Sequence, residues 1–366
     1  WTWSAWVRKH KDSRSTLFSA GATSSDTGFA TLEIETDEQL RYAGWSTLWK
    51  ESTEVFRDYN QFYHIVLAFD STQGTASNRV RMYKNGTEIT DLATNNSISQ
   101  NTDYPINDNV IHYIGGIDGG GGENITLNDY DMTQVYLIDG AALGPENFGF
   151  TDPLTNTWRP KKYNHRKDLY GVTWSSALVG DASGFQSAAA AADGFNGEVG
   201  SSNNQYAQNN TGSNPSTITF TPVGGIKFNS SIQVYLINAA NTVNVNGEGA
   251  QTIAANQWVT VKTGSGTLST LVFSRPSTSG ASFGGIRIDG HILIDAQNDN
   301  SFYLPMDGNS PIGEDKIGNG NNWTPVNFGG SNSLDKATGA LPILNTTQGG
   351  TQAGVGVFGS KENKFY

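Results

Sequence analysis

Five oxygen-bearing side chains lie close together between residues 307 and 321 of this 366-residue chain. They are Asp307, Asn309, Asp315, Asn319 and Asn321, and they alternate with glycines. Carboxylate and amide oxygens are the ligands that Ca²⁺ requires. In glycine-rich loops, however, Asp and Asn also form Asx turns, in which the side chain accepts a hydrogen bond from its own backbone. The stretch therefore predicts either a calcium site or a set of self-capping turns.

A second group of residues has the chemistry of a sugar-binding surface. Trp45, Trp49 and Tyr104 supply aromatic rings, and the polar loop at 118–128 contains Asp118 and Asn124. An exposed aromatic ring offers a face on which a sugar stacks, while carboxylates and amides bind its hydroxyl groups. The alternative is that Trp45 and Trp49 cover the end of the fold or pack against a neighbouring subunit.

An acidic run is the one feature that points to catalysis. In a strand, Glu33, Glu35 and Asp37 would share one face, with Glu38 next to them. Paired carboxylates are what glycoside hydrolysis needs. An exposed acidic strand edge, which blocks strand pairing with other chains, explains the same residues.

The remaining residues exclude several chemistries. The histidines do not have the spacing of metal ligands, and those at positions 64 and 112 are expected to be hydrogen-bonded core residues; the full set is His10, His64, His112, His165 and His291. No Gly-x-Ser-x-Gly motif and no phosphate-binding loop is present. We therefore expect no catalytic residues and no enzymatic activity.

Composition limits the partners. The formal net charge is -11, and no basic stripe of the kind that binds nucleic acid is present. No apolar run approaches the ~20 residues that a membrane span needs. The chain has no cysteine, so disulfides and thiolate metal sites are excluded. Its 43 glycines point to many turns and short strands. We expect an all-β protein that binds neither nucleic acid nor membrane.

The stretch from 61 to 86 predicts a β-hairpin around which the first half is organised. Its apolar runs at 63–69 and 79–83 are followed by Asn85-Gly86, a strong reverse-turn dipeptide. Both faces of the first run are largely apolar, so we expect it in the middle of a sandwich with little water on either side. Further strands are expected at 1–7, 17–20, 30–34, 39–43, 108–116 and 129–139, and a helical turn at 144–148.

From about Lys167 the pattern changes to a second set of short strands. They are expected at 217–221, 231–238, 242–245, 258–262, 267–274 and 285–293. This spacing predicts a second, smaller β-sandwich module. The Gly-rich segment 331–366 contains few large apolar residues and is expected to be an extended C-terminal tail. Trp1 begins inside an expected strand without a preceding methionine, so we expect further residues upstream.

Several motifs in the first half resemble laminin-G and concanavalin-A-like jelly-roll domains. They are WTWSAWVRKH at 1–10, the hairpin at 61–86, QVYLIDGAAL at 134–143 and TDPLTNTWRPKKY at 151–163. As a set they are similar to a domain of structural and tail-fibre proteins of marine bacteriophages. The resemblance implies an all-β fold with a laminin-G-like jelly-roll sandwich, and the smaller module resembles one that recurs in the same phage proteins.

The segment FYLPMDGNSPIGEDKIGNGNNWTPVN at 302–327 resembles the opening strand and turn of a laminin-G-like domain. Either the module is inserted into the first sandwich, or this segment opens another domain. The resemblance favours insertion, with a sandwich at 1–166 completed by 299–330, a module at 167–298 and a tail at 331–366. It also implies that loop carboxylates and amides of this segment bind calcium.

The resemblance implies a non-enzymatic virion structural protein of a phage, as a tail fibre, receptor-binding or capsid-surface protein that recognises a host-surface glycan. Its partners would be other virion proteins and further copies of itself, with a trimer favoured. A secreted or cell-surface bacterial carbohydrate-binding protein is the alternative. A third possibility is a laminarinase-like glycosidase, although that family has Asp where this chain has Glu35 and a terminal Glu one residue away from Glu38.

Overall fold

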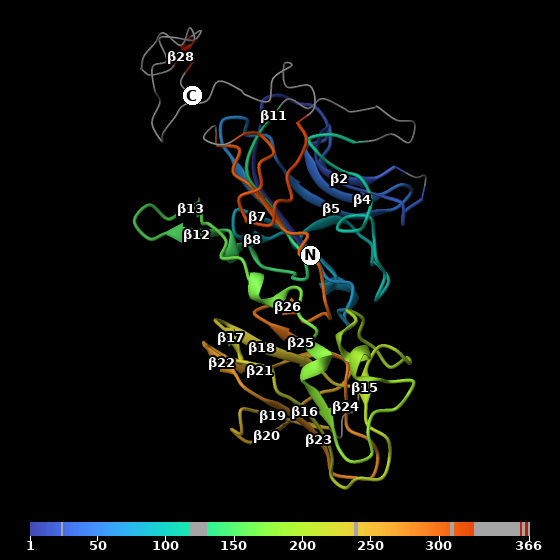
Figure 1. Cartoon of the computed structure of the whole chain (residues 1–366). Helices are drawn as coiled ribbons and strands as arrows, with labels where there is room; N and C mark the ends of the chain where they lie inside the picture. Colours follow the sequence, from blue (N-terminus) through green and yellow to red (C-terminus); the bar gives the residue numbers. More distant parts are fainter. Residues whose placement is uncertain are drawn as a thin grey trace.

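The computed structural model describes residues 1–22, 25–117, 130–237, 241–307 and 311–325, together with the backbone of two short paired strands, β28 (Gly359–Ser360) and β29 (Asn363–Lys364). Every regular element in that part of the chain is a β-strand or a short 3₁₀ helix, which confirms the all-β prediction. Two sandwiches lie one above the other, the N-terminal one drawn mainly in blue (Figure 1). No described helix has both the length and the apolar character needed to cross a membrane.

The N-terminal sandwich has two six-stranded antiparallel sheets. Across the first, the order is β27 (Phe302–Leu304), β11 (Tyr130–Ile138), β1 (Thr2–Lys9), β6 (Tyr63–Phe69), β7 (Val80–Lys84) and β8 (Thr87–Glu88). Across the second, it is β10 (His112–Ile114), β2 (Ser15–Gly21), β3 (Phe29–Ile34), β4 (Gln39–Gly44), β5 (Leu48–Val55) and β9 (Leu92–Asn95). The short helix η1 (Ala76–Asn78) lies between β6 and β7.

Strand β27 joins the first sandwich although the whole module separates it from β11 in sequence. Tyr303 lies opposite Tyr136 in the β11–β27 pair, and the two rings stack with centroids 4.2 Å apart. This pairing makes β27 an edge strand of the first sheet, while the completion of the sandwich by 299–330 stays a prediction. The domain boundaries themselves stay a prediction.

Strand β6 is buried on both faces, as its apolar pattern predicted. Leu67 on one face belongs to the main core between the two sheets. Val66 on the other face packs in a second cluster with Leu143 and Phe148, which flank the helical turn η2 (Pro145–Asn147). The segment after β11 therefore covers the outer face of the sheet and excludes water from it.

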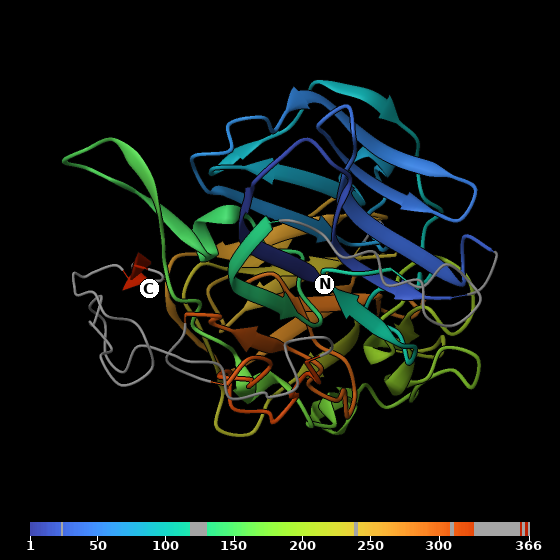
Figure 2. The same cartoon turned by 90° about the horizontal axis from the view of Figure 1, so that it is seen from above.

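A hairpin of β12 (Gly149–Asp152) and β13 (Thr157–Pro160) projects from the side of the first sandwich (Figures 1 and 2). At its base the Trp158 indole N–H donates to Nδ1 of His64 at 2.9 Å, and His64 Nε2 lies 2.9 Å from the Ser4 hydroxyl. Because Nδ1 accepts, the proton of the neutral ring is on Nε2. Burial lowers the pKa of His64 to about 3. His64 is thus the hydrogen-bonded core histidine that the sequence predicted.

The module is a second sandwich with its own aromatic and aliphatic core. One sheet has the order β14 (Leu178–Gly180), β16 (Ser216–Phe220), β23 (Leu271–Arg275), β19 (Thr242–Val245) and β20 (Ala250–Thr252). The other has the order β21 (Trp258–Thr263), β18 (Ser231–Tyr235), β25 (Gly285–Ile288) and β26 (His291–Ile292). Two small pairs complete it, β15 (Ala207–Gln208) with β24 (Ser282–Phe283) and β17 (Ile226–Phe228) with β22 (Gly266–Leu268). Its 3₁₀ helices are η3 (Lys167–Leu169), η4 (Trp174–Ala177) and η5 (Ala191–Phe195).

Two strands that the sequence predicted as continuous are each divided in the structure. The stretch 267–274 is interrupted because the Asn246 amide oxygen accepts the backbone N–H groups of Ser269 and Thr270, at 2.8 and 3.0 Å. The stretch 285–293 turns back on itself at Asp289-Gly290, whose φ angles of 52° and 86° are left-handed.

A buried ion pair connects the two sandwiches. Arg287 on β25 donates from Nη2 to the carboxylate of Asp70, which follows β6, and to the hydroxyl of Thr72 at 2.9 Å. The guanidinium also lies 3.8 Å from the centre of the Trp258 ring. Since both charged side chains are less than a tenth exposed, each neutralises the other in a dry interface.

Candidate ligand-binding cavity

A cavity of about 730 Å³ lies where three segments distant in sequence meet beside β11. The segments are the loop leading into β10, the loop leading into β27 and the loop that follows β27. Six of its eleven lining residues are asparagines; the full set is Asn107, Asp108, Asn109, His112, Leu137, Asn298, Asn300, Phe302, Asn321, Asn322 and Trp323. None of the described residues that line it is Lys or Arg.

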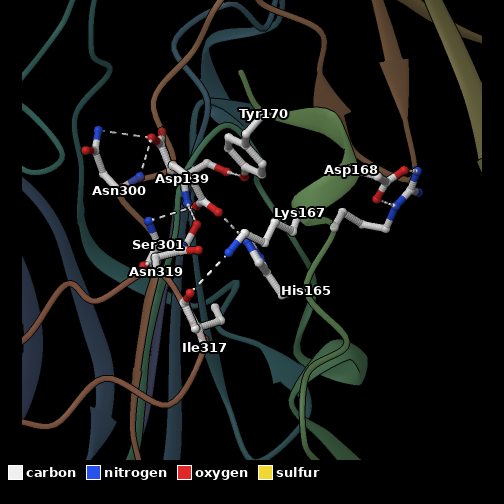
Figure 3. Close-up of polar contacts among 12 residues, drawn as sticks. Asp139, His165, Lys167, Asp168, Tyr170, Asn300, Ser301, Ile317 and Asn319 are labelled. Carbon is white, nitrogen blue, oxygen red and sulfur yellow. Dashed lines mark hydrogen bonds and ion pairs between the residues drawn. The ribbon is translucent and has the colours of Figure 1, made fainter. Parts of the chain in front are cut away.

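The buried carboxylate of Asp139 holds two of these asparagines in place. Asp139 lies just after β11 and is 3% exposed. Its Oδ1 accepts from the side-chain amides of Asn107 at 2.8 Å and Gln297 at 3.0 Å. Its Oδ2 accepts the backbone N–H and the side-chain amide of Asn300, at 3.3 and 3.1 Å (Figure 3). One carboxylate therefore fixes two walls of the cavity relative to each other.

The apolar side of the cavity is aromatic. Trp323 is half-buried, and its ring lies 5.0 Å from that of Phe302 and 6.0 Å from that of Phe18. Its backbone N–H donates to the Gly313 carbonyl at 2.8 Å, which fixes the loop that carries it. The C–H face of a sugar ring is apolar and packs on rings of this kind.

Asp315 organises the loop that carries Asn321 and Asn322. Its two carboxylate oxygens accept four backbone N–H groups, at distances of 2.9 to 3.3 Å, from Tyr303, Ile317, Asn319 and Asn321. Its own N–H donates to the Asn322 amide oxygen at 2.9 Å. These contacts are the self-capping arrangement that the sequence offered as one of its two interpretations.

The calcium site stays a prediction. The side-chain amides of Asn319 and Asn321 both donate to the Ser301 carbonyl, at 3.2 and 2.8 Å. Asp307 is exposed, and Asn309 lies outside the described residues. Within the described ranges, no group of three or more His, Cys, Asp or Glu side chains is positioned to hold a metal ion.

His112 is held in its neutral form beside the cavity. The backbone N–H of Asn107 donates to Nε2 at 3.0 Å, so this nitrogen carries no proton, and Nδ1 lies 2.8 Å from the Val110 carbonyl, to which it must donate. Burial lowers the pKa of His112, against the opposing effect of the Val110 carbonyl. With both ring nitrogens engaged, His112 shapes the loop and has no free proton to transfer.

A polar network behind the cavity ties it to the start of the module (Figure 3). His165 Nε2 lies 2.6 Å from the Asp299 carboxylate, and the Tyr170 hydroxyl donates to the Asp139 carbonyl at 2.5 Å. Lys167 donates to the Gly318 carbonyl at 3.1 Å. The cavity is therefore supported by both sandwiches.

The three described residues that were predicted to bind sugar, Trp45, Trp49 and Tyr104, are not among the residues that line this cavity. Trp45 is 47% exposed, whereas Trp49 is 3% exposed and packs edge-on against Tyr104 within the core, with centroids 4.8 Å apart. Asp118 and Asn124 lie outside the described residues. Trp45 is thus the one described member of the set whose ring is substantially exposed, and its role in sugar binding stays a prediction.

The expected acidic strand edge is not formed, because β3 ends at Ile34 and Asp37 lies in the turn before β4, so only Glu33 of the run belongs to a strand. Glu33 and Glu38 are also buried rather than exposed. Arg14 contacts Glu33 at 2.6 Å, and Arg41 on β4 contacts Glu35 at 3.4 Å and Glu51 on β5 at 2.5 Å. Burial raises the pKa of the Glu33 carboxyl, and Arg14 opposes that effect. Each of these three carboxylates has a cationic partner, which is the arrangement of a charged ladder across strands. The glycosidase alternative stays a prediction.

Sequence reasoning missed this cavity although it named one of its residues. Asn321 was predicted as a calcium ligand, and its side-chain amide instead donates to the carbonyls of Asp299 and Ser301, at 3.0 and 2.8 Å. The available signal was the concentration of asparagines between 298 and 322. Their partner loop at 107–112 is almost two hundred residues away, and only the β11–β27 pairing brings the two together.

Residues 1–126 match the family model described as the concanavalin A-like lectin/glucanases superfamily, which supports the jelly-roll prediction for this part of the chain.

The solved structures that resemble the chain include a mutant of Trypanosoma rangeli sialidase displaying trans-sialidase activity, with 22% identity over 37% of this chain and 20% of that chain and a TM-score of 0.27. They also include a heptameric SAP-like pentraxin from Limulus polyphemus, with 16% identity over 37% of this chain and 61% of that chain and a TM-score of 0.24. The chain thus spans about a fifth of the sialidase, and likeness at this level carries no information on function. The chain matches no curated protein sequence.

Proposed function

We propose that this chain is a non-enzymatic carbohydrate-binding protein and that the asparagine-lined cavity holds the glycan. The observation that carries the proposal is the combination, in one 730 Å³ cavity, of six asparagines with the half-buried ring of Trp323. Amides hydrogen-bond to sugar hydroxyl groups, and an aromatic ring packs on the apolar face of a sugar. The concanavalin A-like family match of residues 1–126 fits carbohydrate binding.

Binding without cleavage follows from the groups that line the cavity. Glycoside hydrolysis canonically uses two carboxyl groups on either side of the scissile bond. Asp108 is the one carboxylate among the described lining residues, and His112 has both ring nitrogens engaged. Asp139 lies behind the asparagines and accepts four hydrogen bonds.

The biological setting that we propose is the virion of a bacteriophage, where the chain would act as a tail-fibre, receptor-binding or capsid-surface protein that recognises a host-surface glycan. Its support is the resemblance of the motifs at 1–10, 134–143 and 151–163 to phage structural proteins. A secreted or cell-surface bacterial carbohydrate-binding protein is the alternative, and the cavity would serve it equally well.

The test is a glycan-array screen of the intact chain, followed by titration of the best glycan. We expect binding without release of sugar products, and we expect Trp323→Ala to weaken it about tenfold, since one aromatic contact contributes roughly 0.5–1.5 kcal/mol. Trp45→Ala is the matched control, because Trp45 is exposed and is not among the lining residues. The cavity assignment fails if Trp45→Ala abolishes binding and Trp323→Ala does not.

The same screen, repeated with a chelator, tests the calcium prediction. A calcium ion bound at 100 times its Kd would add about 2.7 kcal/mol to stability. Asp315 already uses both carboxylate oxygens to accept backbone N–H groups, so we expect neither binding nor Tm to change when calcium is removed. A drop of several degrees in Tm would instead support the calcium prediction.

We also propose that the chain forms a homo-oligomer, with a trimer favoured, and that the β12–β13 hairpin contributes to it. At the end of this projecting hairpin Leu154 is 93% exposed, and Phe150 on β12 is 45% exposed (Figure 2). Exposed apolar side chains on a projecting element are typical of contact surfaces. Light scattering should give an oligomer for the intact chain and a smaller species for Leu154→Asp, whereas Val223→Asp, at another fully exposed apolar position, should leave the mass unchanged.

A further inference from the structure

The hydrogen bonds behind the cavity decide which end of each asparagine side chain is available to a ligand. The Asn300 side-chain nitrogen donates to the Asp139 carboxylate at 3.1 Å, and Figure 3 shows the amide oxygen directed away from it. The Asn321 nitrogen donates to the carbonyls of Asp299 and Ser301, at 3.0 and 2.8 Å. An ionised carboxylate and a carbonyl only accept hydrogen bonds, so the nitrogen ends must face them. The oxygen ends of Asn300 and Asn321 are left for a ligand.

One further acceptor, the Asp108 carboxylate, lies on the rim of the cavity, whereas the Asn107 oxygen is enclosed in its wall. Asn107 donates its side-chain nitrogen to Asp139 at 2.8 Å, and its oxygen is buried without a hydrogen-bond partner in the described part of the chain. Asp108 places a carboxylate on the exposed rim. Asn322 has the opposite orientation, because its oxygen accepts the Asp315 N–H at 2.9 Å and its nitrogen remains as a donor.

The charges near the cavity are mainly negative. Asp139, Asp299 and Asp315 lie behind the wall, and Asp108 lies on the rim. Of the cations in the described loops around them, Lys167 donates to the Gly318 carbonyl at 3.1 Å, and Lys316 pairs with Glu314 at 2.6 Å. A carboxylate or sulfate of a ligand would therefore meet amide oxygens and negative charge, and no Lys or Arg among the described lining residues could pair with it.

Taking the proposed carbohydrate-binding function as the premise, we infer that the cavity selects uncharged, hydroxyl-rich sugars and excludes anionic ones. Hydroxyl groups donate to the oxygens of Asn300 and Asn321, while the nitrogen of Asn322 supplies a donor to a ring or hydroxyl oxygen. Uronic acids, sialic acids and sulfated sugars place acceptors and negative charge against the same oxygens. Selectivity thus arises from the orientation of neutral amides, which the Asp139 carboxylate imposes on Asn300 and the Asp299 and Ser301 carbonyls impose on Asn321.

The experiment compares matched ligands that differ only in charge. Cellotetraose, maltotetraose and β-1,4-galactotetraose are titrated beside the same oligosaccharides with their C6 hydroxymethyl groups oxidised to carboxylates, and a glycan array carrying neutral and acidic glycans is screened in parallel. We expect the neutral form to bind at least tenfold more tightly wherever binding occurs. Asp108→Lys places a cation on the exposed rim at the cost of the hydrogen bond that Asp108 accepts from the Asn109 N–H at 2.7 Å, and should reduce that ratio by raising the affinity for the oxidised form.

The outcomes separate this inference from its premise. If the oxidised forms or acidic array glycans bind as tightly as neutral ones, the chain is a carbohydrate-binding protein and the selectivity argument is overturned. If neither neutral nor acidic glycans bind in any format, the proposed function itself is overturned. If neutral glycans bind more tightly than acidic ones, and Asp108→Lys reduces that difference in affinity, both the proposed function and the selectivity inference are supported.

Discussion

Replacing Arg287 by alanine is expected to lower the free energy of unfolding by about 3–5 kcal/mol, because it leaves the Asp70 carboxylate buried without its cation. Arg287 is 7% exposed, contacts Asp70 and Thr72, and stacks on Trp258. Urea denaturation followed by tryptophan fluorescence measures the loss. Arg159→Ala is the matched control, since Arg159 pairs with Asp152 at 2.8 Å on the half-exposed hairpin and surface pairs contribute less than about 1 kcal/mol.

A double-mutant cycle identifies the cause. If Asp70→Ala and Arg287→Ala each destabilise strongly but the double variant is no worse than either, the penalty belongs to the unpaired charge rather than to lost packing. Independent, additive losses would contradict that explanation and would indicate that Arg287 stabilises mainly through its contact with Trp258.

The same pair predicts how stability depends on pH. Burial raises the pKa of the Asp70 carboxyl, but Arg287 and the hydrogen bonds from Thr72 and Gln73 outweigh burial and hold that pKa below its ordinary value. A carboxyl with a lowered folded-state pKa contributes stability above its unfolded pKa of about 3.9, and that contribution is lost as the pH falls through the folded value. The difference in free energy of unfolding between the parent chain and Arg287→Ala should therefore be largest near pH 7 and should shrink as the pH falls towards the lowered folded-state pKa of Asp70.

Local sequence patterns predicted a structural element correctly where all the residues that determine it lie within one segment. The dipeptide Asn85-Gly86 predicted the turn between β7 and β8, where its φ angles are 49° and 87°, because only residues that tolerate the left-handed region fit such a turn. The apolar run at 63–69 corresponds to β6 without error. Strand β5 was missed because Lys50 and Glu51 make it look like a polar loop. Their partners, Asn95 and Arg41, lie on neighbouring strands, and this is visible only in the folded chain.

The candidate cavity was not predictable in the same way, because its chemistry depends on pairs of distant residues. An asparagine in sequence has no preferred end, since its amide donates and accepts equally well. Asn300 becomes an acceptor only because Asp139, one hundred and sixty-one positions earlier, takes its nitrogen. A tryptophan likewise does not reveal its exposure: Trp49 was considered with Trp45 as a sugar platform, yet their exposed fractions are 3% and 47%.

Removal of the Asp139 carboxylate should therefore cost both stability and binding. Asp139→Ala leaves the side-chain amides of Asn107, Gln297 and Asn300 without their common acceptor. Asn107 and Gln297 are half-buried and Asn300 is exposed, so water can solvate the freed amides. Hydrogen bonds to a charged group contribute about 1.5–3 kcal/mol, and we expect a loss in this range in the free energy of unfolding. Chemical denaturation measures it, with Asp108→Ala as the control that removes an exposed carboxylate from the same cavity.

The effect on binding follows from the freed amides. Without Asp139, the side chains of Asn107 and Asn300 can rotate and present nitrogen as readily as oxygen, so affinity for a neutral glycan should fall at least tenfold, about 1.4 kcal/mol. Asp139→Asn should lose affinity almost as strongly, since an amide has one accepting oxygen where the carboxylate accepts from three side chains. A folded Asp139→Asn variant that binds with unchanged affinity would show that amide orientation does not control recognition. If the variant instead loses both its affinity and its preference for neutral over acidic glycans, amide orientation does control recognition.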